Sequence, residues 1–239
     1  MQRYFVSKEN NNFILKDSDL HHIKNVMRLK SGDNIICVYE NHSYLCSINY
    51  TKENYSITVL DNLSKDVELD KKVILYQALI KNDNFDLVVQ KATEIGASII
   101  VPTIFKRSVI KIDNNKKDSK IERYNKIVKE ASEQSHRQKL PTIAQYINVK
   151  DIKLDKNTLG LMAYENNQDS YSFKNSLYEL DGYQNIAVVI GPEGGFEQDE
   201  LDYLLSVGFK SISLGKRILR SETAAIYALS VISYYLEGK

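Results

Sequence analysis

The protein has 239 residues, of which 43% are hydrophobic and 26% charged, and its net charge is +1. This composition argues against a highly basic coat protein or an acidic disordered tail. No apolar run approaches the roughly 18 residues of a membrane span, and the first residues lack the apolar stretch of a signal peptide. The two cysteines, Cys37 and Cys46, have no CxxC or Cys/His cluster beside them, which argues against a zinc ribbon or a disulfide framework. We therefore expect a soluble, cytoplasmic protein with no membrane segment and no metal.

The first part of the chain, residues 1–70, is predicted to form a small, mostly β domain. Apolar residues recur at helical spacing over 17–29, which predicts a helix there. Strands are expected at 34–40, 43–50 and 55–63. The polar segment 64–72 is the natural linker to the rest of the chain.

From residue 73 onward, short apolar strands alternate with amphipathic helices. Strands are expected at 73–80, 98–104, 158–164, 185–191 and 211–215. Helices are expected at 85–96, 119–138, 198–208 and 222–236. Alternation of this kind predicts a mostly parallel sheet covered on both faces. Ligands of such sheets bind at the carboxyl ends of the strands.

A glycine-rich turn, IGPEGGF, follows the strand at 185–191 directly. Its glycines allow the backbone to approach a ligand closely. The turn is not a P-loop, because no Gly-Lys-Ser/Thr follows, and it lacks the GxGxxG of a dinucleotide fingerprint. Taken alone, it is an ordinary structural turn as readily as a binding loop.

A second motif, LGKRILRSETAA, joins the last strand to the last helix, with Ser221 as the expected N-cap. Arg217 and Arg220 flank the apolar pair Ile218 and Leu219. Such a loop can line an apolar ligand slot and place two guanidinium groups at its mouth. Glu222 falls in the first helical turn, where the helix dipole favours a carboxylate.

Two further predicted helices carry charged residues whose positions suggest specific contacts. Glu94 lies at the end of the helix at 85–96, where the dipole disfavours an anion, so we expect a partner, either Lys91, a neighbouring backbone group or another subunit. Glu130, Gln134 and Arg137 would share one face of the helix at 119–138. Residues 102–140 carry eleven basic and five acidic side chains, a net charge of +6. This excess of positive charge predicts a phosphate-binding surface. A solvent-exposed helix face would show the same excess.

Taken together, the motifs resemble the ribosomal RNA small-subunit methyltransferase E family, the uridine-N3 methyltransferases of 16S rRNA in the SPOUT superfamily. The resemblance extends from RYFV through HHIKNVMRLKSGD, QKATEIGASIIVP, KRSV and EASEQSHRQKLP to IGPEGGF and LGKRILRSETA. It covers nearly the whole chain, and the last two motifs in succession are its most specific part. The chain departs from the family pattern at Ile95, where Leu is usual, and at Glu197, where Ser or Thr is expected.

This resemblance implies an α/β fold of two domains. Residues 1–70 would form a PUA-like, RNA-binding β-barrel, and residues 73–239 a SPOUT methyltransferase domain with a parallel sheet and a deep trefoil knot. The protein would bind S-adenosylmethionine in the knot, act as a homodimer, and methylate uridine N3 in 16S rRNA of the small ribosomal subunit.

The resemblance also implies a cofactor site built from three loops, at Leu161–Glu165, Gly191–Phe196 and Leu214–Ser221. The cofactor-binding residues expected there are Leu161, Met162, Ala163, Gly191, Pro192, Glu193, Gly194, Gly195, Leu214, Gly215, Ile218 and Leu219.

Uracil N3 must lose a proton in the reaction, and negative charge then spreads onto O2 and O4. Arg220 is the candidate cation for that charge, and Glu222 is the candidate general base. Phosphate contacts are expected from Arg3, Arg28, Lys106, Arg107 and Arg137.

The last helix is apolar on most of its circumference, which predicts cover on more than one side. One stripe faces the core, formed by Ala225, Ala228, Leu229, Ile232, Tyr235 and Leu236. Ile226, Tyr227, Val231 and Tyr234 fall largely outside it and predict a second subunit as cover.

Three alternatives remain open at this point. The first is a SPOUT enzyme that acts on transfer RNA or large-subunit RNA. The second is a non-catalytic RNA-binding protein with a degenerate knot. The third is a nucleotide hydrolase, which the absence of a Walker motif disfavours.

Overall fold

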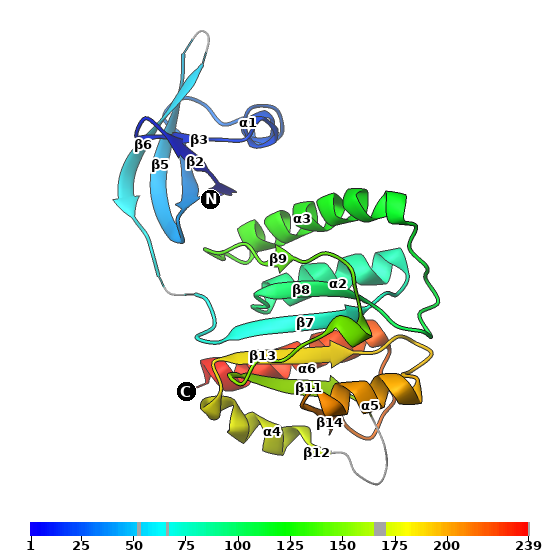
Figure 1. Ribbon diagram of the computed structural model, residues 1–239. Helices are drawn as coiled ribbons and strands as arrows, with labels where there is room; N and C mark the ends of the chain where they lie inside the picture. Colours follow the sequence, from blue (N-terminus) through cyan, green and yellow to red (C-terminus); the bar gives the residue numbers. More distant parts are fainter. Residues whose placement is uncertain (52–53, 66, 165–170, 239) are drawn as a thin grey trace. The chain divides into compact units, whose positions relative to one another are not determined.

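The computed structural model describes residues 1–51, 54–65, 67–164 and 171–238. The chain divides into two compact units (Figure 1). Unit 1 comprises Met1–Glu68 and Ser132–Leu140, and unit 2 comprises Leu69–Ala131 and Pro141–Lys239. Nothing in the sequence pattern indicated that Ser132–Leu140 belongs with unit 1.

Unit 1 is a four-stranded sheet of order β1-β4-β5-β6 with a separate β2-β3 hairpin. Its strands are β1 (Arg3–Phe5), β2 (Ser7–Glu9), β3 (Asn12–Ile14), β4 (Asn34–Tyr39), β5 (His42–Tyr50) and β6 (Tyr55–Asn62). The predicted helix is shorter than expected: α1 (Asp17–His21) continues as the π-helical turn η1 (His22–Val26). Ile23 in this turn is fully buried, and it packs with Tyr4, Ile35 and Ile48 in the core of the unit.

Within unit 1, the segment 132–140 is hydrogen-bonded to the segment 1–68, mainly through the Glu68 carboxylate. Glu68 accepts hydrogen bonds from the backbone N–H groups of Gln138 and Lys139, both at 3.0 Å, and pairs with the Arg137 guanidinium at 2.6 Å. Gln138 also donates to the Ser43 hydroxyl at 3.3 Å. These bonds join residues far apart in sequence, so periodicity could not reveal them.

Unit 2 is an eight-stranded sheet in which every pairing is parallel. Its order is β10-β8-β7-β13-β11-β14-β12, with β9 paired to β8. The strands are β7 (Lys72–Ala78), β8 (Ile99–Ile104), β9 (Thr142–Ile143), β10 (Ile147–Asn148), β11 (Thr158–Ala163), β12 (Tyr171–Ser172), β13 (Asn185–Ile190) and β14 (Phe209–Ser213). The predicted α/β class and parallel sheet are confirmed.

Helices cover both faces of this sheet (Figure 1). They are α2 (Asn82–Glu94), α3 (Lys117–Gln134), α4 (Phe173–Glu179), α5 (Gln198–Ser206) and α6 (Ser221–Glu237), with short 3-10 turns η2 (Asn114–Lys116), η3 (Val149–Asp151) and η4 (Leu180–Gly182). Adjacent strand residues point to opposite faces. Val188 therefore packs with the α2, α3 and α6 side, and Val189 packs with α5 on the other. None of the described helices is long and apolar enough to span a membrane.

Helix α3 ends at Gln134, four residues before the predicted end. His136 adopts a left-handed conformation with φ of +61°, and the Arg137 N–H donates to the Ser132 carbonyl at 3.0 Å. This is a Schellman-type C-cap with His in the place usually taken by glycine. The expectation that Arg137 shares a helix face with Glu130 and Gln134 is therefore wrong. The partner expected for Glu94 is confirmed, because Lys91 pairs with it at 2.8 Å.

Candidate active site

A cavity of about 730 Å³ lies where β11, β13 and β14 end and α6 begins. Because the strands are parallel, their carboxyl ends meet at one edge of the sheet, and the loops that follow them line the cavity. Its walls are formed by Ala163, Tyr164, Ile190, Gly191, Pro192, Glu193, Gly195, Phe196, Ile212, Leu214, Gly215, Lys216, Arg217, Ile218, Leu219, Arg220, Ser221 and Ala224. The size and the mainly apolar lining are typical of a small-molecule or cofactor site.

Aromatic packing and the backbone conformation of its glycines determine the position of the glycine-rich turn after β13. A Cβ on Gly191 would lie 2.8 Å from the Phe196 ring, so a larger residue would displace that ring. Phe196 in turn makes edge contacts with Phe105 and Tyr164, at centroid separations of 5.4 and 5.8 Å. Gly195 has φ of +72°, with open space where a side chain would project. The turn thus brings backbone to the cavity wall.

The loop between β14 and α6 forms the opposite wall. Gly215 has φ of +124°, a conformation that favours glycine. Leu219 packs against the core, whereas the Ile218 side chain is 96% exposed. Arg217 and Arg220 are both exposed and both line the cavity. The loop therefore contributes both apolar residues and two arginines to the lining of the cavity.

Ser221 connects this loop to the glycine-rich turn. It is the first residue of α6, with Arg220 at the N-cap position, so the predicted cap is shifted by one residue. The Ser221 hydroxyl donates to the Gly191 carbonyl at 2.7 Å and accepts a bond from the Gln77 amide at 2.9 Å. Sequence reasoning missed Gln77; the only signal was a lone amide near the end of an apolar strand.

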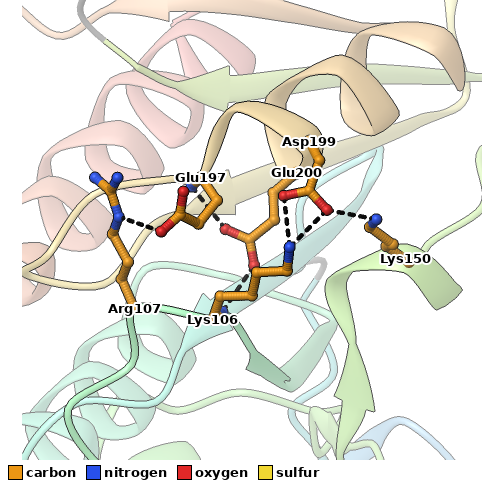
Figure 2. Close-up of polar contacts among 6 residues, drawn as sticks. All are labelled: Lys106, Arg107, Lys150, Glu197, Asp199 and Glu200. Atoms are coloured by element: carbon orange, nitrogen blue, oxygen red, sulfur yellow. Dashed lines mark hydrogen bonds and ion pairs between the residues drawn. The ribbon is translucent and has the colours of Figure 1, made fainter.

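A network of charged groups supports the glycine-rich turn from outside the cavity (Figure 2). Arg107 donates to the Glu197 carboxylate at 2.8 Å and to the Gly194 carbonyl at 3.2 Å. The buried carboxylate of Glu200 accepts the backbone N–H groups of Lys106 at 2.7 Å and of Glu197 at 2.9 Å. Glu197 is the N-cap residue of α5, so the departure from the expected Ser or Thr is compensated by Glu200.

Asp199 extends this network. It pairs with Lys106 at 2.8 Å and with Lys150 at 2.6 Å. Hydrogen bonds from the two lysines lower the pKa of Asp199 to about 2, and the bond to Asp199 raises the pKa of Lys106. The bond to Glu197 raises the pKa of Arg107. Sequence reasoning did not identify Lys150, Asp199 or Glu200, whose roles depend on contacts between distant segments.

Most of the residues predicted to bind cofactor line the cavity: Ala163, Gly191, Pro192, Glu193, Gly195, Leu214, Gly215, Ile218 and Leu219. Three others are not among the residues that line the cavity. Leu161 and Met162 lie inside β11 and are fully buried on opposite faces of the sheet. Gly194 faces away from the cavity, because a Cβ there would lie 3.0 Å from that of Arg107. Glu165, the end of the predicted first loop, lies outside the described residues.

The two predicted catalytic residues are placed differently. Arg220 lines the cavity. Glu222 does not; its carboxylate accepts a hydrogen bond from the Asn84 amide at 3.1 Å, which connects α6 to the first turn of α2. Glu222 thus makes a contact between two helices, and its role as general base stays a prediction.

The predicted phosphate ligands also differ from one another. Arg28 is exposed, and Lys106 and Arg107 are exposed but already paired with acidic groups. Arg3 is half-buried and donates to the Ser43 hydroxyl at 2.8 Å, and its burial lowers its pKa. Arg137 is a correction: its side chain is 6% exposed and paired with Glu68, so it is not a surface phosphate ligand. Within the described part of the chain, no three His, Cys, Asp or Glu side chains form a metal-binding group.

The sequence matches two family models. An RNA methyltransferase domain matches residues 67–233, and an RNA methyltransferase PUA domain matches residues 15–60. The first match covers all of the cavity-lining residues.

Individual relatives are similar over nearly their full length. The chain is 34% identical to the ribosomal RNA small subunit methyltransferase E of Bacillus subtilis, covering 99% of this chain and 98% of the relative. It is 38% identical to the enzyme of the same name from Mesomycoplasma hyopneumoniae, covering 96% and 98%. A Legionella pneumophila protein solved with the bound cofactor SAM has a TM-score of 0.85 and 29% identity, covering 97% of this chain and 96% of that chain. The chain belongs to the ribosomal RNA small subunit methyltransferase E family.

Proposed function

We propose that the protein transfers a methyl group from S-adenosylmethionine to uridine N3 in 16S rRNA of the small ribosomal subunit. The observation that carries this proposal is the cavity formed by the glycine-rich turn and the β14–α6 loop, in a chain of this family. The names of the relatives and the SAM-bound Legionella structure support the reaction and the cofactor.

The cavity residues fit an adenosyl cofactor. Its apolar walls, among them Ile190, Leu214, Leu219 and Ala224, suit the flat base of an adenosyl group. Gly191, Gly195 and Gly215 allow backbone groups to approach them closely. When bound, the cofactor supplies an electrophilic methyl group on a sulfonium.

The acceptor chemistry assigns a role to Arg220. Uracil N3 attacks the methyl group only after its proton passes to a base or to water, and the resulting anion spreads onto O2 and O4. A guanidinium at the edge of the cavity stabilises charge that develops during the reaction more than it stabilises bound substrate. Positioning of the two reactants supplies much of the remaining acceleration.

On the RNA side, the exposed Arg28 is the clearest phosphate ligand, with Arg3, Lys106 and Arg107 as further contacts. We also propose a homodimer that covers the exposed aromatic face of α6, where Tyr234 is 80% exposed.

The deep trefoil knot stays a prediction from the family resemblance. A protein that modifies ribosomal RNA is expected in the cytoplasm.

The test is methyl transfer in vitro with methyl-labelled S-adenosylmethionine. Small ribosomal subunits, free 16S rRNA, 23S rRNA and transfer RNA are offered separately, and the labelled nucleoside is identified by mass spectrometry. The proposal predicts 3-methyluridine in the small subunit or in 16S rRNA. Label only in transfer RNA or 23S rRNA would identify a different substrate, and cofactor binding without transfer to any RNA would contradict an enzymatic role.

A further inference from the structure

One polar side chain beneath the cavity has no role in the chemistry described above. Gln77 lies near the carboxyl end of β7 and has no exposed surface. In the sheet register it is opposite Ile190 of β13 on one side and Pro102 of β8 on the other. Burying an amide is unfavourable unless its hydrogen bonds are made, so the partners of Gln77 indicate what it does.

The bonds of Gln77 have a fixed direction. Its Nε2 donates to the Ala78 carbonyl at 3.1 Å and to the Ser221 Oγ at 2.9 Å, which uses both amide hydrogens. Because Ser221 accepts this bond, its own proton is free to donate to the Gly191 carbonyl, at 2.7 Å. The chain of bonds thus runs from β7 through the first residue of α6 to the glycine-rich turn.

The amide orientation follows from its neighbours. If its oxygen and nitrogen were exchanged, the oxygen would face the Ala78 carbonyl, and two acceptors would repel each other. In the observed orientation, Gln77 Oε1 is buried and has no donor among the described residues. An unsatisfied buried acceptor is destabilising. An apolar residue would not leave such an acceptor buried, so stability alone does not explain an amide at this position.

We propose that Gln77 is a positioning residue for the cofactor site. Through Ser221 it holds the Gly191 carbonyl against the start of α6 and so fixes the distance between the two cavity walls. Gly191 and Ser221 both line the cavity, whereas Gln77 does not. The inference rests on the proposed function, since it assigns Gln77 to the site that binds S-adenosylmethionine.

The test compares Gln77→Met, which keeps the length of the side chain but removes the donor, with Thr103→Val as a matched control. Thr103 is also fully buried, near the end of the adjacent strand β8, and its hydroxyl donates only locally, to Val101 at 2.9 Å. Calorimetry measures S-adenosylmethionine affinity, and thermal melting measures stability. We expect Gln77→Met to raise the cofactor Kd and KM about tenfold, with RNA affinity unchanged. Thr103→Val should change the Kd less than twofold, even if it lowers the melting temperature by as much as Gln77→Met does.

A double-mutant cycle with Ser221→Ala tests whether Gln77 affects cofactor binding through Ser221. If Gln77 acts through Ser221, the double variant should bind cofactor no more weakly than the worse single variant. Additive losses, or a folded Gln77→Met variant with the parent Kd, would overturn the proposal. If Gln77→Met does not fold, an unchanged Kd in Ser221→Ala would overturn it instead. A parent protein that binds no S-adenosylmethionine would contradict the proposed function. This result differs from a failure of the Gln77 proposal, in which the parent binds cofactor and the variant binds it equally well.

Discussion

Arg107 and Gly194 are in direct contact: the guanidinium donates to the Gly194 carbonyl at 3.2 Å, and a Cβ on Gly194 would lie 3.0 Å from the Arg107 Cβ. The added atom would also lie 3.1 Å from the Arg107 carbonyl oxygen, so a side chain at position 194 would require its neighbours to move by a few tenths of an ångström. The glycine at this position therefore allows close contact with the segment after β8.

This contact predicts how Gly194→Val acts. The added side chain should push the glycine-rich turn away from Arg107 and weaken S-adenosylmethionine binding by at least about tenfold, although it does not enter the cavity. Calorimetry measures the affinity, and circular dichroism confirms the fold. A folded variant with the affinity of the parent would show that the position of the turn does not govern binding.

Arg220→Ala separates chemistry from binding. Because its charge is needed most when the uracil becomes anionic, the single-turnover methylation rate should fall about 10²-fold, with a smaller loss of RNA affinity. Arg217→Ala is the matched control, since Arg217 is also exposed on the same cavity wall. Equal losses of rate and affinity would make Arg220 an ordinary binding residue.

Arg28→Gln tests the phosphate contacts. Removing one contact should lower the slope of log affinity against log salt by about one unit. Filter binding over a range of salt concentrations measures the slope, and cofactor affinity should not change. An unaltered slope would remove Arg28 from the RNA interface.

Arg137→Met should act on stability instead. The variant leaves the buried Glu68 carboxylate without its guanidinium, and breaking such a pair from one side costs about 3–5 kcal/mol. Urea denaturation measures the loss, and replacing Glu68 with Met as well should recover part of it. A lower salt slope at unchanged stability would restore Arg137 to the predicted RNA surface.

The exposed face of α6 predicts the oligomeric state. Tyr227 and Tyr234 are exposed, whereas Val231 packs against the core, so the tyrosines test the interface without disturbing the fold. Tyr227→Asp with Tyr234→Asp should convert dimers to monomers in light scattering and reduce activity. Leu205→Asp, on the exposed side of α5, is the control and should leave the dimer intact. A parent protein that is monomeric at micromolar concentration would contradict the dimer.

The elements of unit 2 could be predicted because their patterns are local. Helical spacing placed Ala225, Ala228 and Ile232 of α6 in the core, where all three are fully buried. The family resemblance implied Gly191, Gly215 and Leu219 as cofactor-site residues, and all three line the cavity at the carboxyl edge of the parallel sheet.

The remaining features depend on contacts that sequence patterns do not show. Gln77 and Ser221 are 144 residues apart, and the Lys106 backbone bond to Glu200 spans 94 residues. The sequence pattern predicts Arg137 as a surface cation in a basic helix. In the structure, the turn at His136 directs the chain toward Glu68, with which Arg137 pairs. In each case the partner was assigned by tertiary structure and not by spacing.

Methylation of uridine N3 in 16S rRNA can be measured in cells by nucleoside mass spectrometry of 16S rRNA from a strain in which this gene is deleted. The strain is complemented with the parent gene or with Arg220→Ala. We expect 3-methyluridine to disappear on deletion, to return with the parent gene, and to stay low with the variant. Full 3-methyluridine in the deletion strain would contradict the proposed methylation.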